Sequence, residues 1–234
     1  MAGSTRTSQI LQALTTTSAD LASLPQHLVA TCAQAVPVTG VGMVLMTDAG
    51  PAGVVAATDG PAARMEELQF TLGEGPCVDS SRTGRPVLQP DLARSGPARW
   101  PGFTAGALEA GIAAIYAFPL RVGSIRLGVL DLYRDRPETL SALELAEALS
   151  FADAATTLLL HLQAQSPPNS VGVEAVAVIE DRAQVHQATG MIAEQLGVSL
   201  ASALIMLRGR AYASERPILA LANDVLAGEV LFKL

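Results

Sequence analysis

The sequence predicts an α+β domain built on an antiparallel sheet, followed by a separate all-α bundle of three helices. Three observations lead to this prediction. Two pairs of short apolar runs, each joined by a turn, are typical of β-hairpins. Helical patterns flank these hairpins and do not alternate with single strands. After a linker rich in serine and proline, apolar residues recur with helical spacing in three short segments.

Residues 8–35 are predicted to be helical. We expect Pro25 to divide this helix into two pieces, because proline lacks the backbone N–H that a helix interior needs. Apolar residues and one threonine fall near a seven-residue repeat, at Ile10, Leu14, Thr17, Leu21, Leu24 and Leu28. This repeat fits a helix that packs on its own sheet and equally a helix that pairs with a second copy of the chain.

The sheet is predicted from two hairpins and one further strand. The expected elements, in chain order, are a hairpin of residues 41–47 and 54–58, a helix over 61–70, a short helix that ends at Gly84, a strand over 85–89, a helix over 100–110, a hairpin of residues 113–121 and 124–133, and a long helix from Ser141 to Gln165. Ser141 is expected to cap that last helix.

The C-terminal bundle has clear helix boundaries in the sequence. Gly197 suits the left-handed position after a helix, Ser199 can cap the next helix, and Pro217 suits the first turn of the third. Apolar stripes are expected at Leu200, Ala203, Leu204, Leu207 and Ala211, and at Ile218, Leu221, Ala222 and Val225. The predicted domains are residues 1–165, a linker over 166–172, and residues 173–234.

The charge balance argues against a general polyanion binder. The formal net charge is −7, and both parts are acidic: residues 1–173 carry 10 basic and 15 acidic side chains, and residues 174–234 carry 5 and 7. Any contact with nucleic acid must therefore come from a local patch of cations.

Cys32 and Cys77 have no paired spacing, which is typical of a reduced cytosolic protein. The N-terminus does not resemble a signal peptide, and the longest apolar run, near residues 158–160, is too short for a membrane span. We expect a cytoplasmic protein.

The C-terminal segment resembles the ANTAR domain, the RNA-binding module of bacterial transcription antitermination regulators. The residues that carry the resemblance are Arg182 with Ala188 and Gly190, the turn Leu196-Gly197-Val198-Ser199, the run Leu207-Arg208-Gly209-Arg210-Ala211, and Leu219-Ala220-Leu221-Ala222. Two positions depart from the family pattern. Thr189 stands where the family usually has lysine, and Leu204 stands where it often has phenylalanine.

Residues 20–163 resemble a GAF domain of the type that precedes ANTAR domains in actinobacteria-type regulators. The residues that carry this resemblance are Gly73-Glu74-Gly75-Pro76-Cys77, the strand from Pro86 to Asp91, Arg99-Trp100-Pro101-Gly102-Phe103, Ala110-Gly111-Ile112, Pro119-Leu120 and Gly128-Val129-Leu130-Asp131-Leu132-Tyr133. The resemblance implies a sensor domain that can hold a small ligand between its sheet and the helical excursion.

The candidate RNA-binding residues in this ANTAR-like segment are Arg182, His186, Thr189, Arg208, Arg210 and Arg216. Taken one by one, these side chains also fit an ordinary solvated surface, and the family resemblance is what favours RNA binding. Arg182, His186 and Thr189 would form one polar stripe of a helix. Arg208 and Arg210 would lie about 80° to either side of the apolar stripe of theirs. Arg216, at the start of the third helix, suits a phosphate contact. The resemblance further implies binding to leader stem-loops and antitermination.

A small-molecule pocket in the N-terminal domain is a second candidate site. Its predicted lining residues are Cys77, Trp100, Phe103, Tyr116, Phe118 and Arg121, although the aromatic ones could equally fill the core. Cys77 could be a reactive thiol near a helix start or a small buried residue. We predict no enzymatic activity, metal or cofactor, because the sequence has no catalytic triad, no paired acid and base, and no metal-ligand spacing.

The sequence therefore predicts a homodimeric cytoplasmic regulator that binds structured leader RNA and responds to an effector in its GAF-like domain. Two other functions stay open. The protein could be a ligand-sensing or protein-interaction module without RNA binding. It could also be a sensor with haem or redox chemistry at Cys77 or a histidine.

Overall fold

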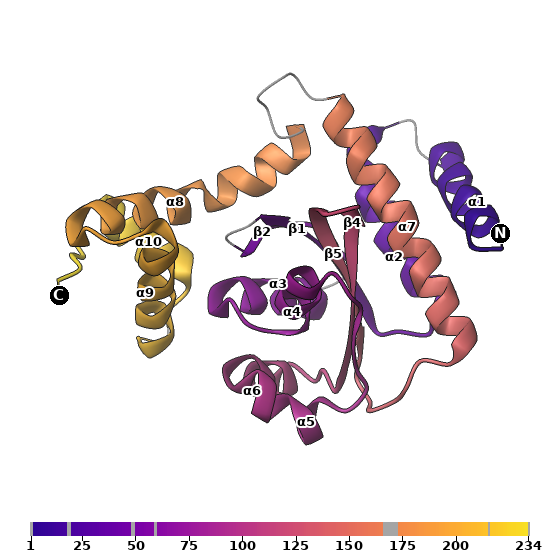
Figure 1. Ribbon diagram of the computed structural model, residues 1–234, viewed down its shortest axis with the longest axis horizontal. Coiled ribbons are helices and arrows are strands. Elements are labelled where there is room, and N and C mark those ends of the chain that lie inside the picture. The colour runs from indigo at the N-terminus through magenta and orange to yellow at the C-terminus, as the bar shows by residue number, and fades with distance from the viewer. Residues whose placement is uncertain are drawn as a thin grey trace.

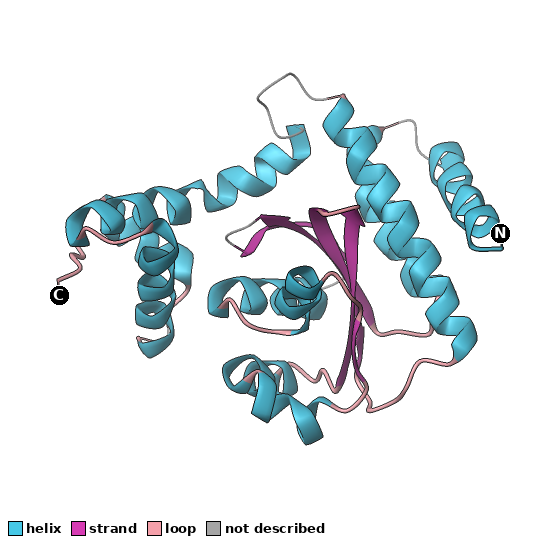
Figure 2. Ribbon diagram, viewed as in Figure 1, coloured by secondary structure: helices cyan, strands magenta, loops and turns pink. Residues whose placement is uncertain are grey.

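The computed structural model describes residues 2–17, 20–47, 50–58, 60–165, 173–214 and 216–233, and the side chains of residues 2–4 and 173–182 lie outside this description. Its elements in chain order are α1 (Ala2–Thr17), the 3₁₀ turn η1 (Leu21–Ser23), α2 (Leu24–Ala35), β1 (Gly40–Thr47), β2 (Gly50–Ala57), α3 (Gly60–Leu72), α4 (Pro76–Thr83), β3 (Val87–Gln89), α5 (Leu92–Arg99), α6 (Pro101–Glu109), β4 (Ala114–Val122), β5 (Ile125–Arg134), α7 (Ala142–Ala164), α8 (Val173–Leu196), α9 (Leu200–Ala213) and α10 (Ile218–Leu226) (Figure 1). This confirms the predicted α+β class with helices at the C-terminal end (Figure 2).

Within the described residues the strands form one antiparallel five-stranded sheet with the order β2-β1-β5-β4-β3. Both predicted hairpins are present, as β1–β2 and β4–β5. The first and the last long strands, β1 and β5, lie side by side in the middle. Successive side chains of a strand point to opposite faces, so Val129 and Tyr133 share one face of β5 while Leu130 and Leu132 share the other.

Helices cover both faces of the sheet (Figure 1). One core lies beneath α2 and α7 and includes Met43, Tyr116 and Leu130. The other lies beneath α3 to α6 and includes Trp100 and Phe103. Helix α1 packs against the outer side of α7. The bundle of α8, α9 and α10 lies on the side of the α3–α6 layer, away from α7.

The N-terminal helix breaks earlier than predicted. Helix α1 ends at Thr17, and Asp20 caps η1 by accepting a hydrogen bond from the N–H of Ala22 at 3.1 Å. Pro25 does not break the helix, because it lies in the first turn of α2, where no intrahelical N–H bond is made. The buried residues Ile10, Leu14, Leu24 and Leu28 pack into the core of their own domain. Helix α5, which Asp91 caps, was not predicted from the sequence.

The predicted cap of α7 is confirmed. Ser141 Oγ accepts from the N–H of Glu144, whose side chain in turn accepts from the N–H of Ser141. By length and composition alone α7 could also span a membrane, contrary to the prediction from apolar runs. In this fold, however, buried residues such as Phe151 and Leu158 pack one side of the helix into the domain core.

The C-terminal helices form as predicted, with two differences. Gly197 has a φ of +64°, in the left-handed region, and Ser199 caps α9 by accepting from the N–H of Ser202. The predicted stripes are buried and pack together, except that Leu200 is exposed. Pro217 lies at the N-cap of α10, one residue before its first turn.

Candidate functional site

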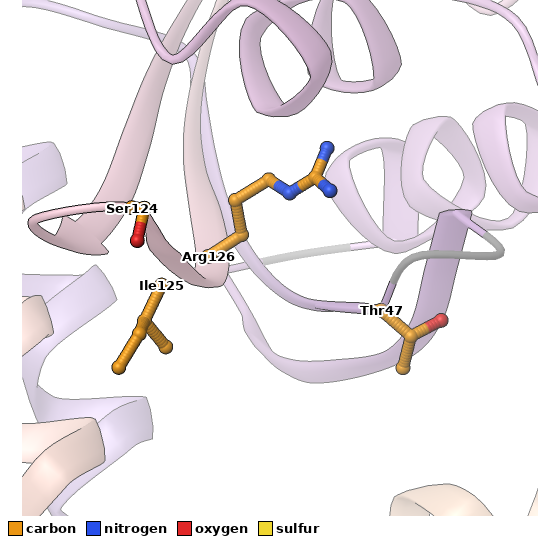
Figure 3. Close-up of a pocket in the computed structure, with 4 residues that line it drawn as sticks. All are labelled: Thr47, Ser124, Ile125 and Arg126. Carbon is orange, nitrogen blue, oxygen red and sulfur yellow. The ribbon is translucent and has the colours of Figure 1, made fainter.

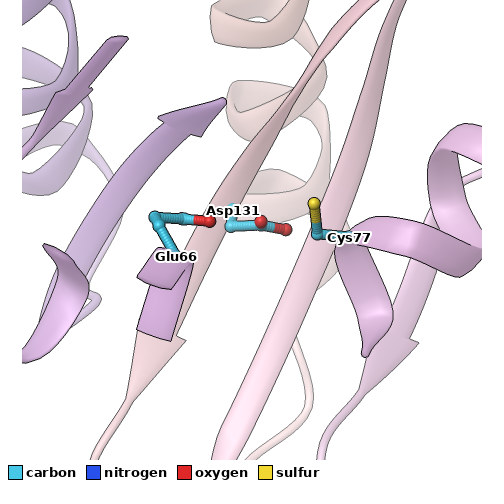
Figure 4. A group of neighbouring side chains, drawn as sticks. All are labelled: Glu66, Cys77 and Asp131. Atoms are coloured by element: carbon cyan, nitrogen blue, oxygen red, sulfur yellow. The ribbon is translucent and has the colours of Figure 1, made fainter. Parts of the chain in front are cut away.

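A buried group of acidic side chains and a thiol lies between the sheet and the excursion of helices. Glu66 comes from α3, Cys77 from the start of α4 and Asp131 from the middle of β5, and we name these three residues the acid–thiol cluster (Figure 4). Their possible ligand atoms all lie within 4.8 Å of one another. All three side chains are buried, which is rare for carboxyl groups.

Hydrogen bonds from Gln69 and Tyr133 hold the cluster in place. The amide Nε2 of Gln69 donates to Asp131 Oδ2 at 3.3 Å and to Glu66 Oε2 at 3.4 Å. The Gln69 Oε1 accepts from the N–H of Cys77 at 2.8 Å. The Tyr133 hydroxyl donates to Glu66 Oε1 at 2.5 Å. Since Glu66 and Gln69 lie one turn apart on α3, one helix face serves both sides of the cluster.

Burial changes the protonation of these groups. It raises the pKa of the Asp131 carboxyl to about 7, although the adjacent polar side chains of Gln69, Cys77 and Glu66 lower this pKa in part. It also raises the pKa of the Cys77 thiol well above its ordinary value, and the nearby Asp131 and Glu66 raise it further. Of the two environments predicted for Cys77, the structure has the small buried residue, because a protonated and inaccessible thiol is a poor nucleophile.

Helix α3 also contacts the C-terminal bundle. Phe70, which directly follows Gln69, packs in the bundle core with residues such as Leu207 and Ile218. Arg208 of α9 donates from Nε to the carbonyl oxygen of Phe70 at 3.1 Å, and its guanidinium carbon lies 5.7 Å from the centroid of the Phe70 ring. We name this pair the docking contact. Gly73 makes room for it, since a Cβ there would lie 2.6 Å from Arg208 Nη1.

Two surface cavities flank these features. One of about 510 Å³ lies between the N-terminal domain and α9, and its lining includes Gly73, Glu74, Gly102, Ile205, Arg208 and Tyr212. The other, of about 430 Å³, opens between the turn of the β4–β5 hairpin and the end of β1, and is lined by Thr47, Ser124, Ile125 and Arg126 (Figure 3). Neither cavity is lined by the aromatic residues that were predicted to hold a ligand.

The predicted ligand-binding residues do not line one pocket. Trp100 and Phe103 lie with Cys77 in the core beneath α3 to α6. Tyr116 and Phe118 lie in the core on the opposite face of the sheet, because they are two residues apart on β4 and both point toward α2 and α7. Arg121 is exposed and lies against Gly84. The prediction of one pocket lined by all six residues is therefore wrong. Their side chains lie on the two opposite faces of the sheet and, for Arg121, at the protein surface.

The predicted polar stripe on α8 is not a continuous surface. Thr189 is only 4% exposed, and its hydroxyl donates to the carbonyl oxygen of Val185 at 2.6 Å. A short β-branched side chain can bond to the preceding turn in this way, which places it inside the bundle. His186 is exposed, and the side chain of Arg182 lies outside the described residues.

The other predicted RNA-binding arginines point to three different partners. Arg208 makes the docking contact. Arg210 donates to the carbonyl oxygen of Leu231 at 3.0 Å, and its guanidinium carbon lies 4.9 Å from the Phe232 ring centroid. Arg216 forms an ion pair of 2.6 Å with Asp224. Among the side chains described, the expected shared cationic surface is therefore not assembled within one chain.

Sequence reasoning missed the acid–thiol cluster and the docking contact. The one local signal was Asp131, an acidic residue in the middle of an apolar strand, where burial of a charge is costly. Nothing in the spacing of Glu66 or Phe70 indicates their partners, which lie 65 and 138 positions further along the chain.

An antiparallel sheet between a layer of two helices and an excursion of short helices, with polar side chains buried beneath the excursion, is the architecture of a GAF-type α+β domain. The chain belongs to the GAF domain family, whose match covers residues 18–159. The family match does not reach α8, α9 and α10, so the ANTAR resemblance depends on its sequence motif.

Solved structures share this fold. A domain of a protein described as a two-component sensor histidine kinase from Sinorhizobium meliloti 1021 aligns with a TM-score of 0.52 and 18% identity, covering 63% of this chain and 96% of that one. The GAF domain of an Acinetobacter phosphoenolpyruvate-protein phosphotransferase aligns with a TM-score of 0.53 and 12% identity, covering 70% and 96%. A search of curated proteins finds no match. These solved structures share the GAF fold with this chain.

Proposed function

We propose that this GAF protein is a cytoplasmic, signal-responsive regulator that binds structured leader RNA through α8 to α10 and promotes transcription antitermination. The ANTAR-like motif supports this function, because its residues fall on the three helices α8, α9 and α10, which pack together. The observation that carries the proposal is the docking contact. It joins Arg208, an arginine of the motif, to α3, the helix that supplies Glu66 of the acid–thiol cluster.

In this proposal the GAF domain controls RNA binding through α3. The Nε of Arg208 donates to the Phe70 carbonyl oxygen when the bundle contacts α3. A bundle in this docked position therefore presents fewer cationic groups to RNA phosphates than a bundle released from α3. A signal that shifts α3 would change the population of docked and released bundles. Arg210 and His186 are exposed in the docked arrangement and would supply the first RNA contacts.

We further propose that the protein is a homodimer, so that two bundles meet two RNA loops. The support is the part of the α7 surface that α1 leaves uncovered, where Leu149 and Leu160 are 42% and 40% exposed. They are eleven residues apart, about three helical turns, and therefore lie on the same side of α7.

Crosslinking RNA to the protein in cells, followed by sequencing of the bound RNA, tests the function and identifies the target together. The proposal expects leader regions that can form paired stem-loops to be enriched over total RNA. The matched control is the variant Arg208→Ala/Arg210→Ala expressed at the same level, which should lose this enrichment. Equal recovery of leader RNA with both proteins would contradict RNA binding through the bundle.

A protein-interaction module without RNA binding is the second candidate. It is favoured by the exposed apolar side chains of α9, Ile205 and Tyr212, which are 67% and 62% exposed. The burial of Thr189, at a position where the ANTAR family usually has lysine, points the same way.

An absorbance spectrum of freshly purified protein tests the third candidate, a haem or redox sensor.

A further inference from the structure

The acid–thiol cluster contains a carboxylate oxygen that has no partner among the described residues. Asp131 is fully buried, and its Oδ2 accepts from Gln69, but its Oδ1 makes no hydrogen bond. In Figure 4 the Asp131 carboxyl group lies between Glu66 and Cys77 and points toward Cys77. A buried oxygen of this kind requires a proton or a cation as its partner.

The space around the cluster is made by glycines. A Cβ on Gly42 would lie 2.0 Å from Glu66 Oε1, and a Cβ on Gly75 would lie 2.5 Å from Gln69 Oε1. Gly42 is paired with Asp131 across β1 and β5, so the missing side chain opens the site where the carboxyl groups meet. The backbone is therefore shaped to bring Glu66 and Gln69 to Asp131.

We propose that Glu66, Cys77 and Asp131 bind a divalent transition-metal cation, with Zn²⁺ as the first ion to test. Zinc bonds to carboxylate oxygen at about 2.0–2.2 Å and to thiolate sulfur at about 2.3 Å, which puts the ligand atoms of a tetrahedral site roughly 3.4–3.6 Å apart. The donor atoms lie within 4.8 Å of one another, so the three side chains would close around the ion on binding. A thiolate among the ligands favours such an ion over Mg²⁺ or Ca²⁺.

The neighbouring hydrogen bonds would orient these ligands. The Tyr133 hydroxyl donates to Glu66 Oε1, and the Gln69 amide donates to Asp131 Oδ2, which leaves Oδ1 for the metal. On binding, the S–H bond of Cys77 breaks, the sulfur electron pair binds the metal, and the proton leaves to solvent. The cation also offsets the negative charge of the two buried carboxylates. This site does not depend on RNA binding, and its test is independent of it.

The experiment is a metal titration of the full-length protein after treatment with a chelator and its removal. Co²⁺ serves as the spectroscopic probe, because cobalt bound to a thiolate gives a charge-transfer absorption in the near ultraviolet. We expect saturation at one ion per chain, displacement of the absorption by Zn²⁺, and a rise in the melting temperature with Zn²⁺.

Three variants make the result specific. Asp131→Asn keeps the shape of the side chain and removes a buried acid, so it should fold, and it should weaken the affinity for Co²⁺ at least tenfold. Cys77→Ser should abolish the charge-transfer absorption. Cys32→Ser is the matched control, because Cys32 is also a free buried thiol but lies on the other face of the sheet. Circular dichroism confirms that each variant is folded.

The proposal is overturned if the wild-type protein shows no charge-transfer absorption, or if folded Asp131→Asn binds Co²⁺ as tightly as the wild type. It is also overturned if Cys32→Ser loses the absorption. In those cases protons, and not a metal, satisfy the buried carboxyl groups, in agreement with the raised pKa of Asp131.

Discussion

Arg208 of the C-terminal bundle donates a hydrogen bond to the carbonyl oxygen of Phe70, the residue that directly follows Gln69, whose amide donates to the acid–thiol cluster. The side chain of Phe70 is 2% exposed and belongs to the core of the bundle and not to that of the GAF domain. One helix, α3, therefore contributes to the interior of both parts of the chain. This relationship joins the GAF domain directly to the bundle through α3.

Phe70→Ala should release the bundle. Removing a buried phenylalanine costs about 3–5 kcal/mol, and here the loss falls on the contact between α3 and the bundle. Hydrogen exchange followed by mass spectrometry should show faster exchange in α9 and unchanged exchange in β1 and β5. Leu88→Ala, at a residue of β3 that is 42% exposed, is the control. Unaltered exchange in α9 would mean that Phe70 does not hold the bundle.

Gly42 and Gly190 should respond in opposite ways to alanine. Gly42→Ala places a methyl group against the Glu66 carboxylate and should destabilise the fold by about 1–3 kcal/mol. Gly190 lies inside α8 with nothing near its added Cβ, so Gly190→Ala should stabilise by about 0.5–1 kcal/mol. Urea denaturation of both variants measures the difference. Similar effects of the two substitutions would contradict the packing of Glu66 against β1.

Glu144→Gln should destabilise the protein at neutral pH by about 1 kcal/mol. The carboxylate caps α7 through the N–H of Ser141 and pairs with Arg134 at 2.8 Å, and the capping bonds lower the pKa of Glu144. A group with a lowered folded-state pKa stabilises the fold above its unfolded pKa, and this contribution is lost as the pH falls through the lowered value.

The difference between the wild type and Glu144→Gln should therefore shrink as the pH is lowered through the carboxyl range. Urea denaturation at several pH values measures it, with the exposed Glu109→Gln as the control. A difference that stays constant down to acid pH would show that the charge of Glu144 is not involved.

The dimer prediction concerns the exposed leucines of α7. Leu149→Lys/Leu160→Lys should shift the protein from dimer to monomer, because it places two charges in the proposed apolar contact. Light scattering after size exclusion gives the mass. Leu88→Lys, a similarly exposed leucine on the edge strand, should leave the mass unchanged. A wild-type protein that is monomeric at every concentration would contradict the dimer.

Local patterns predicted much of the fold. The hairpins follow from turn residues between apolar runs, the start of α7 from Ser141, and the end of α8 from Gly197, because each of these signals acts within a few residues. The sites could not be predicted in this way. Asp131 meets Glu66, and Arg208 meets Phe70, only after the sheet and the bundle have formed. The arginines on α9 were expected at the surface, but α3 supplies a carbonyl group and an aromatic ring that hold Arg208 at the domain contact.

The most direct test of RNA binding through the bundle is the affinity for a recovered leader RNA, measured over a series of salt concentrations. Arg208→Ala/Arg210→Ala should bind more weakly than the wild type, and the slope of log affinity against log salt should fall by about one to two. Arg85→Ala, which removes one exposed charge from the GAF domain, should change neither quantity. The same affinity and the same slope for the double variant and the wild type would contradict the proposed function.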